Sequence, residues 1–200
     1  MKRIFLSFLF FFVGSFLVQT KAISYSSDPE SFISEVIDEA KVILSSPSSS
    51  EEKAEKLSQI ALKTVDIKGL AFYTLGKKRK EITPEQLKKY EDLFEKYFLK
   101  SFTSRLTDYS DPKISVLSSE VVNNKYTIVK TMLLKTDKKP EVKIDWRVYT
   151  KDPDNPLIRD LIIEGLSLAR TQKEEFASVL SANNNDINEL FSTLEKFINK

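Results

Sequence analysis

The sequence predicts an α+β fold in which several helices flank a twisted, four-stranded antiparallel meander sheet with one apolar face to cover. Before residue 113 and after residue 165, apolar side chains recur at three- and four-residue steps, as in amphipathic helices. Between these regions apolar and polar residues alternate, most clearly at Val142, Ile144 and Trp146, which indicates strands with one dry face. The four expected strands are 114–121, 125–136, 141–150 and 157–164.

Turn residues separate these strands. Asn123 and Asn124 form a tight-turn pair, Pro140 ends the segment 137–140, and two prolines with an asparagine occupy 152–156. Consecutive strands should therefore pair antiparallel.

The second strand is apolar on both faces, so we expect it near the centre of the sheet. Ile128, Met132 and Leu134 share one face, while Val129 and Leu133 share the other. We expect the face with Ile128, Met132 and Leu134 to meet the helices, although Lys130 lies in the same row.

Capping signals indicate where helices begin. Gly76 is expected to close a short third helix, and the longest helix, which follows it, carries an aromatic stripe that should extend to Tyr109. A turn at 183–186 should separate the last two helices. The residues expected at helix N-termini are Asp28, Ser49, Thr83 and Thr171.

The first 22 residues have the pattern of a cleaved secretory signal peptide, which leaves 23–200 as a single domain. A basic start is followed by a short apolar run and a small residue, Ala22, at a plausible cleavage site. The alternative is a retained membrane anchor, but the run is short for one, because crossing a bilayer takes about 20 apolar residues. Cleavage removes three basic residues and no acidic one, so the net charge falls from +2 to −1. Nucleic-acid binding is therefore not expected.

The chain contains no cysteine and no histidine, so the usual nucleophiles, bases and zinc ligands are missing. Gly165-Leu-Ser167 resembles part of a nucleophile elbow, but no histidine exists to activate the serine. Asp145, Asp160 and Glu164 are carboxylates on expected strands, where polar residues are mostly solvated. The acidic loop after Asp152 lacks the spacing of a calcium site. We expect neither an enzyme nor a metal site.

A basic run, Lys77-Lys78-Arg79-Lys80, directly follows the expected end of the third helix. One interpretation is a loop that complements the negative end of the helix dipole. The other is a contact with anionic lipid headgroups, to which each charge contributes on the order of 1 kcal/mol. The sequence leaves both open.

The remaining chemistry is apolar binding, in a cavity between the sheet and the helices. Two acyl chains carry about 30 methylenes, and moving each into water costs about 0.8 kcal/mol, so a carrier for lipids needs a deep, dry cavity. The expected lining comes from the aromatic stripe and from the sheet. It consists of Phe72, Phe94, Phe98, Phe102, Ile128, Met132, Leu134, Ile144, Trp146, Leu161 and Ile163.

Three blocks of sequence resemble the MlaC family, also described as toluene tolerance proteins. Asp160-Leu-Ile-Ile-Glu-Gly-Leu-Ser-Leu168 is similar to the family's D-V-x-x-E-G-x-S-L segment. Leu75-Gly76 with Thr83-Pro-Glu-Gln86 and the following aromatic residues fits a second block, and 186–194 fits the closing helix. The chain departs from the family at Lys78-Arg79 and at 171–173, which leaves partner contacts there in doubt.

The resemblance implies a periplasmic, monomeric phospholipid carrier that is not an enzyme and needs no cofactor besides its bound lipid. Such a carrier passes lipid between an outer-membrane lipoprotein complex and an inner-membrane ABC transporter. This transfer maintains the lipid asymmetry of the outer membrane. The alternative is a periplasmic chaperone-like module whose apolar groove receives polypeptide.

Overall fold

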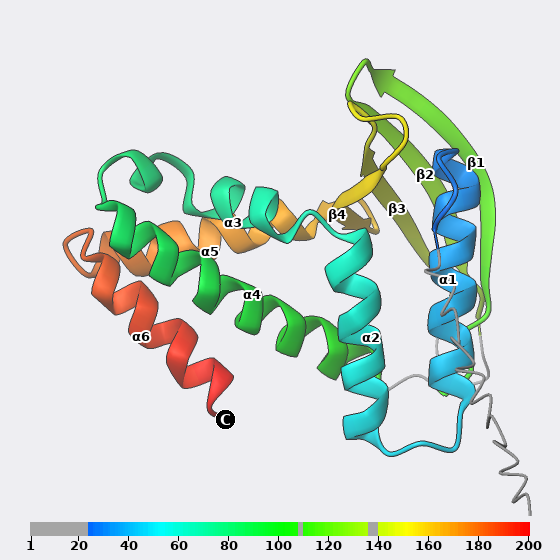
Figure 1. The fold of residues 1–200 in the computed structure, drawn as a ribbon, viewed down its shortest axis with the longest axis horizontal. Coiled ribbons are helices and arrows are strands. Elements are labelled where there is room, and N and C mark those ends of the chain that lie inside the picture. The colour runs from blue at the N-terminus through cyan, green and yellow to red at the C-terminus, as the bar shows by residue number, and fades with distance from the viewer. Residues whose placement is uncertain (1–23, 108–109, 136–139) are drawn as a thin grey trace, which may run out of the picture.

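The computed structural model describes residues 24–107, 110–135 and 140–200. The proposed signal peptide, Tyr109 and most of the expected turn at 137–140 lie outside these residues. In the described part, helices and strands follow one another in the expected order (Figure 1). The helices are α1 (Pro29–Ser45), α2 (Ser50–Thr64), α3 (Ile67–Leu75), the 3-10 helix η1 (Gly76–Lys80), α4 (Pro84–Leu106), α5 (Leu168–Ala182) and α6 (Ile187–Ile198). The strands are β1 (Ile114–Asn123), β2 (Tyr126–Leu133), β3 (Val142–Tyr149), β4 (Leu157–Ile163) and β5 (Leu166–Ser167).

The strands form one antiparallel sheet in the order β1-β2-β3-β4-β5. The predicted α+β meander is confirmed, but the sheet has five strands rather than four. The fifth strand escaped prediction because two residues cannot display a period of two.

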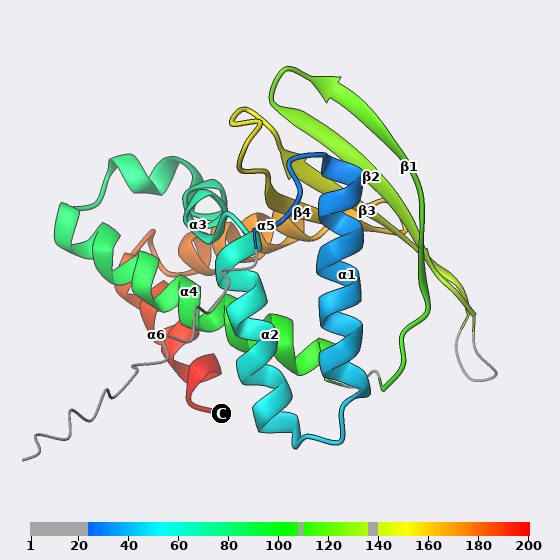
Figure 2. The same ribbon diagram turned by 45° about the vertical axis from the view of Figure 1, so that its right-hand side comes forward.

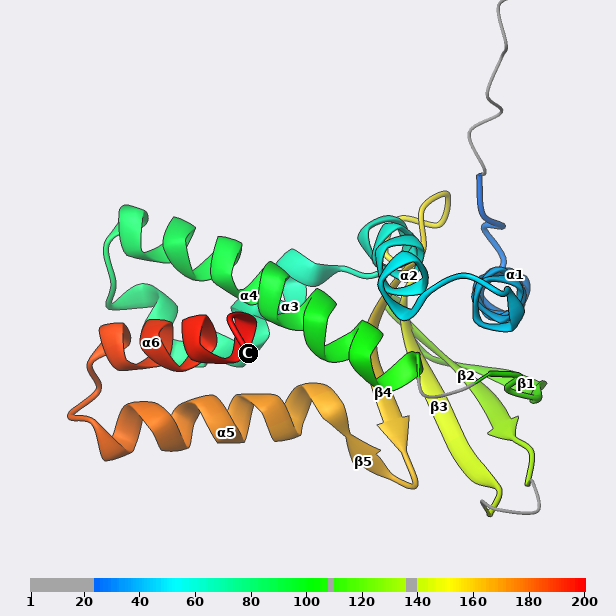
Figure 3. The ribbon, with the colours of Figure 1, turned by 90° about the horizontal axis from the view of Figure 1, so that it is seen from below.

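The helices form two groups around this sheet. α1 and α2 lie beside its curved inner face, whereas α3, α4, α5 and α6 form a lobe that extends away from the sheet (Figures 1 and 2). Seen from below, α5 continues from the β4–β5 hairpin into this lobe, and α4 runs back toward α2 (Figure 3).

Each group has its own apolar core. The helical core lies among α3, α4, α5 and α6 and includes Tyr90, Phe94 and Phe176. The sheet core lies among α1, α2 and the strands and includes Phe32 and Val129. A cavity can therefore form between the two cores, where the helical lobe meets the sheet with α1 and α2.

Most helix ends follow the predicted caps. Asp28, Ser49 and Thr83 each accept a hydrogen bond from a backbone amide of the first turn, and Gly76 ends α3 with a positive φ of 61°. The prediction for α5 was wrong: its N-cap is Ser167 rather than Thr171, four residues earlier.

Candidate functional site

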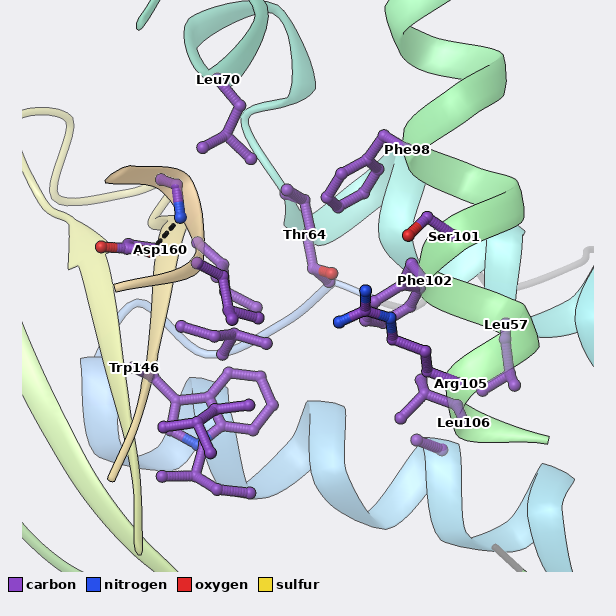
Figure 4. A pocket seen from close by; sticks show the side chains of 18 of the residues that line it. Leu57, Thr64, Leu70, Phe98, Ser101, Phe102, Arg105, Leu106, Trp146 and Asp160 are labelled. Carbon is purple, nitrogen blue, oxygen red and sulfur yellow. Dashed lines mark hydrogen bonds between the residues drawn. The ribbon is translucent and has the colours of Figure 1, made fainter. Parts of the chain in front are cut away.

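A cavity of about 620 Å³ lies between the helical core and the sheet core (Figure 4). Both cores contribute to its lining, together with the connections between them. Most of the lining side chains are apolar. The apolar members are Val36, Ile37, Ala40, Leu44, Leu57, Ile60, Val65, Leu70, Phe94, Phe98, Phe102, Leu106, Pro112, Ile114, Leu133, Ile144, Trp146, Ile158, Leu161, Ile163, Leu168 and Ala169.

An aromatic ridge on α4 lines one side. Phe94, Phe98 and Phe102 follow one another at four-residue steps, which places them on one face of the helix. The ring centroids of Phe94 and Phe98 are 6.3 Å apart, and those of Phe98 and Phe102 are 5.7 Å apart with nearly parallel planes. The predicted aromatic stripe therefore forms a continuous surface along the cavity.

The sheet lines the opposite side. Ile144 and Trp146 on β3 pair with Ile163 and Leu161 on β4, so these four predicted residues lie together on the inner face. The indole nitrogen of Trp146 donates a hydrogen bond to the hydroxyl of Thr131 at 3.0 Å, which holds the ring in place.

Four of the eleven predicted residues are not among those that line the cavity. Ile128 and Met132 lie on the outer face of β2, because their row pairs with Arg147 and Lys143 on β3 and contains Lys130, which contacts Glu120. Charged side chains keep that row in water, so the inner row of β2 carries Val129 and Thr131 instead.

The other two predicted residues outside the lining are Leu134, at the end of a strand, and Phe72, on the outer side of a helix. Leu134 follows the last residue of β2 and is 41% exposed. Phe72 lies on the outer side of α3, where the ammonium of Lys68 sits 5.4 Å from its ring centroid. α3 contributes Leu70 and Thr74 to the cavity instead.

The contribution of the first two helices was missed. Val36, Ile37 and Leu44 on α1, with Leu57 and Ile60 on α2, line the cavity on a third side. Their helical spacing was recognised in the sequence, but spacing alone does not distinguish a packed core face from a face that borders a cavity.

Four of the described residues that line the cavity are charged. Arg105 and Glu175 are exposed, Lys41 is half-buried and contacts Asp38 at 3.3 Å, and Asp160 is buried. Because most of the other lining side chains are apolar, the cavity surface is mainly suited to hydrocarbon.

Tyr97 lies between the cavity and the helical core. Its hydroxyl donates a hydrogen bond to the side-chain oxygen of Gln172 at 2.7 Å. Burial raises the pKa of Tyr97, and the nearby carboxylate of Glu175 raises it further. The phenol is therefore neutral at ordinary pH and acts as a hydrogen-bond donor.

Asp160 and Ser167, which were weighed as catalytic candidates, hold the chain at the start of α5. The Asp160 carboxylate accepts from the Ser167 hydroxyl and from the amide of Ala169, and Arg147 lies 3.7 Å away. These contacts give both side chains a structural role at the junction between β5 and α5. No group of His, Cys, Asp or Glu within the described ranges is arranged to hold a metal ion.

The basic run forms η1 at the end of α3. A guanidinium nitrogen of Arg79 donates to the carbonyl oxygen of Phe72 at 3.2 Å, and Lys78 contacts Glu81 at 3.4 Å. The Arg79 contact agrees with a cation that complements a helix end. None of the helices formed by the described residues combines the length and apolar character needed to span a bilayer.

The geometry defines a class of α+β protein in which a curved sheet and two groups of helices enclose an apolar chamber. A model of the MlaC protein family matches residues 34–196, so the chain belongs to the MlaC family. The family predicted from three sequence blocks is thereby confirmed.

A solved structure has a similar fold. It is the phospholipid-binding protein from Ralstonia solanacearum in complex with a phospholipid, and the match has a TM-score of 0.71 at 18% sequence identity. The match covers 88% of this chain and 97% of that chain. No curated protein sequence matches this chain.

Proposed function

We propose that this protein is a soluble phospholipid carrier that holds acyl chains in the cavity between its two cores. The observation that carries the proposal is the size and apolar character of this cavity, about 620 Å³. Membership of the MlaC family and a phospholipid-binding structural neighbour support the same ligand class.

The energetics of the cavity favour an apolar occupant. The lining is mainly apolar, and covering apolar surface with hydrocarbon instead of water contributes about 25 cal/mol per Å². Water contacts this lining less favourably, because most of the lining side chains are apolar and offer it no hydrogen-bond partner. Acyl chains would cover this apolar surface by contacting the aromatic ridge and the sheet.

The expected location is the periplasm, after cleavage of the signal peptide at residues 1–22. There the carrier would pass phospholipid between an outer-membrane lipoprotein complex and an inner-membrane ABC transporter. Transport energy would come from the ATPase of that transporter.

Organic extraction of the purified mature protein, followed by mass spectrometry, tests the ligand. The expected result is glycerophospholipid at close to one molecule per protein. Extraction that yields no lipid, or copurification with polypeptide in the cavity instead, would overturn the proposal and favour the chaperone-like alternative.

A second assay tests the carrier role. Protein loaded with a fluorescent phospholipid is incubated with unlabelled vesicles that carry either reconstituted partner complex, and lipid transfer is followed by fluorescence. Transfer that depends on the partner supports shuttling, whereas a protein that retains its lipid in the presence of both complexes argues against it.

A further inference from the structure

We propose that Arg105 recognises the phosphate group of the bound lipid at the edge of the cavity. This inference rests on the proposed function and deepens it, because it assigns a polar subsite to a cavity that is otherwise apolar. The chemical class recognised is a phosphate monoester or diester that carries two acyl chains.

The position of Arg105 suits this role. It lies in the last turn of α4, one turn beyond Ser101, and both residues line the cavity. Figure 4 shows the guanidinium group directed into the cavity, on the side of Thr64, rather than away from the protein. Long side chains on a helix lean back toward its N-terminus, which brings the charged group over the turn that carries Ser101 and Phe102.

Arg105 lies where solvent meets the apolar lining of the cavity. The residue is exposed, yet its neighbours Phe102 and Leu106 line the apolar cavity. A lipid with its chains along the aromatic ridge therefore brings its phosphate to the region where the cavity meets solvent. An arginine at that point can donate two parallel hydrogen bonds to phosphate oxygens.

The other charged groups of the lining are less suited to binding an anion. Lys41 is already close to the carboxylate of Asp38. Asp160 and Glu175 are acidic, and the former is engaged by Ser167 and Ala169. Among the described residues Arg105 makes no ion pair. The hydroxyl of Ser101 adds a neutral donor on the same face of α4.

The test compares two lipids with identical chains, dioleoyl phosphatidylglycerol and dioleoylglycerol, which lacks the phosphate. Delipidated wild-type protein and the variants Arg105→Gln and Arg105→Lys are loaded from mixed vesicles, and occupancy is measured by native mass spectrometry. Lys96→Gln is the matched control, because it removes one exposed positive charge from the same helix without touching the cavity.

The expected result is a loss of phosphatidylglycerol binding in Arg105→Gln of about ten-fold, the usual effect of losing a hydrogen bond to a charged group, with dioleoylglycerol binding unchanged. Arg105→Lys should lose less, and Lys96→Gln should match the wild type. An equal loss for both lipids would mean that Arg105 only supports the helix, and it would overturn the inference.

Two further outcomes separate the possible failures. If the wild-type protein binds neither lipid, the proposed carrier function itself fails. If both lipids bind and Arg105→Gln leaves their ratio unchanged, only the phosphate subsite fails. Binding of inorganic phosphate to the delipidated protein as tightly as the lipid would also overturn the inference, because the site would then recognise a free anion.

Discussion

The carboxylate of Asp160 accepts a hydrogen bond from the hydroxyl of Ser167 at 2.6 Å, across the tight turn that joins β4 to β5. The two residues of this turn, Glu164 and Gly165, have positive φ values of 49° and 82°. Ser167 in turn accepts from the amide of Arg170 at 3.1 Å, which caps α5. The D-x-x-x-E-G-x-S segment therefore sets the direction in which the helical lobe leaves the sheet.

Replacing either partner should destabilise the protein. Asp160→Asn supplies only one acceptor oxygen for two donors, and Ser167→Ala removes the cap, so we expect losses of about 2–3 and about 1–2 kcal/mol in the free energy of unfolding. Urea denaturation followed by circular dichroism measures both. The exposed variant Glu174→Gln is the control. Full additivity of the two changes in the double mutant would show that the side chains do not interact.

Gly69→Ala should also destabilise the protein, although glycine to alanine in a helix normally stabilises it by about 1 kcal/mol. A Cβ at Gly69 would overlap the carboxylate of Asp66. That carboxylate accepts from the Gly69 amide at 2.9 Å and from two nitrogens of Arg159 at 2.5 Å, so it cannot move without losing a link between α3 and β4. We expect a net loss of about 1–2 kcal/mol.

Thermal and urea unfolding of a double-mutant cycle tests this explanation. In an Asp66→Ala background the overlap is gone, so Gly69→Ala should become neutral or stabilising. If Gly69→Ala destabilises both backgrounds equally, the Asp66 carboxylate is not the cause.

Patterns of period two and period 3.6 were sufficient to predict the fold class and the order of elements, because they report which side of each element is dry. They failed where the local signal was short or ambiguous. Thr171 matches a capping box, yet Ser167 starts the helix because the turn at Glu164 and Gly165 delivers the chain there.

The candidate site was predicted in part. The predicted lining residues on α4 follow from its aromatic stripe, and those on β3 and β4 follow from the alternation of apolar and polar residues. The face of β2 was misassigned, since two apolar rows are equivalent in sequence until the pairing of Lys130 with Glu120 and Asp145 decides which one meets water. Whether an apolar helix face borders a packed core or a cavity depends on volumes that no single element specifies.

The corrected strand faces lead to a prediction for lipid content. Trp146→Asp places a charge in the apolar cavity and should reduce copurified phospholipid at least ten-fold, whereas Met132→Asp on the outer face should keep it. Phosphorus per mole of protein after organic extraction is the measurement. If Trp146→Asp does not fold, Ser101→Trp is a second variant, because its large side chain on α4 fills part of the cavity and should also reduce the lipid content. A folded Met132→Asp protein without lipid would contradict the assignment.

Alkaline pH should destabilise the protein, in part through Tyr90. This side chain is fully buried, its hydroxyl lies 2.9 Å from that of Thr74, and burial raises its pKa well above the ordinary value of 10.0. Above about pH 10 the unfolded chain loses the phenolic proton while the folded protein keeps it, so the unfolded state binds fewer protons. The free energy of unfolding therefore falls by about 1.4 kcal/mol per pH unit for this group until the folded-state pKa is reached.

Tyr90→Phe should remove that part of the slope between pH 10 and 11.5, at the cost of about 1 kcal/mol at neutral pH for the lost hydrogen bond. Urea titrations at several pH values give the slope directly. Some dependence remains, because burial also raises the pKa of Tyr97 and of Tyr25. Tyr73→Phe, which removes an exposed hydroxyl group, is the control. An unchanged slope in Tyr90→Phe would show that the phenol ionises as readily in the folded protein as in the unfolded chain.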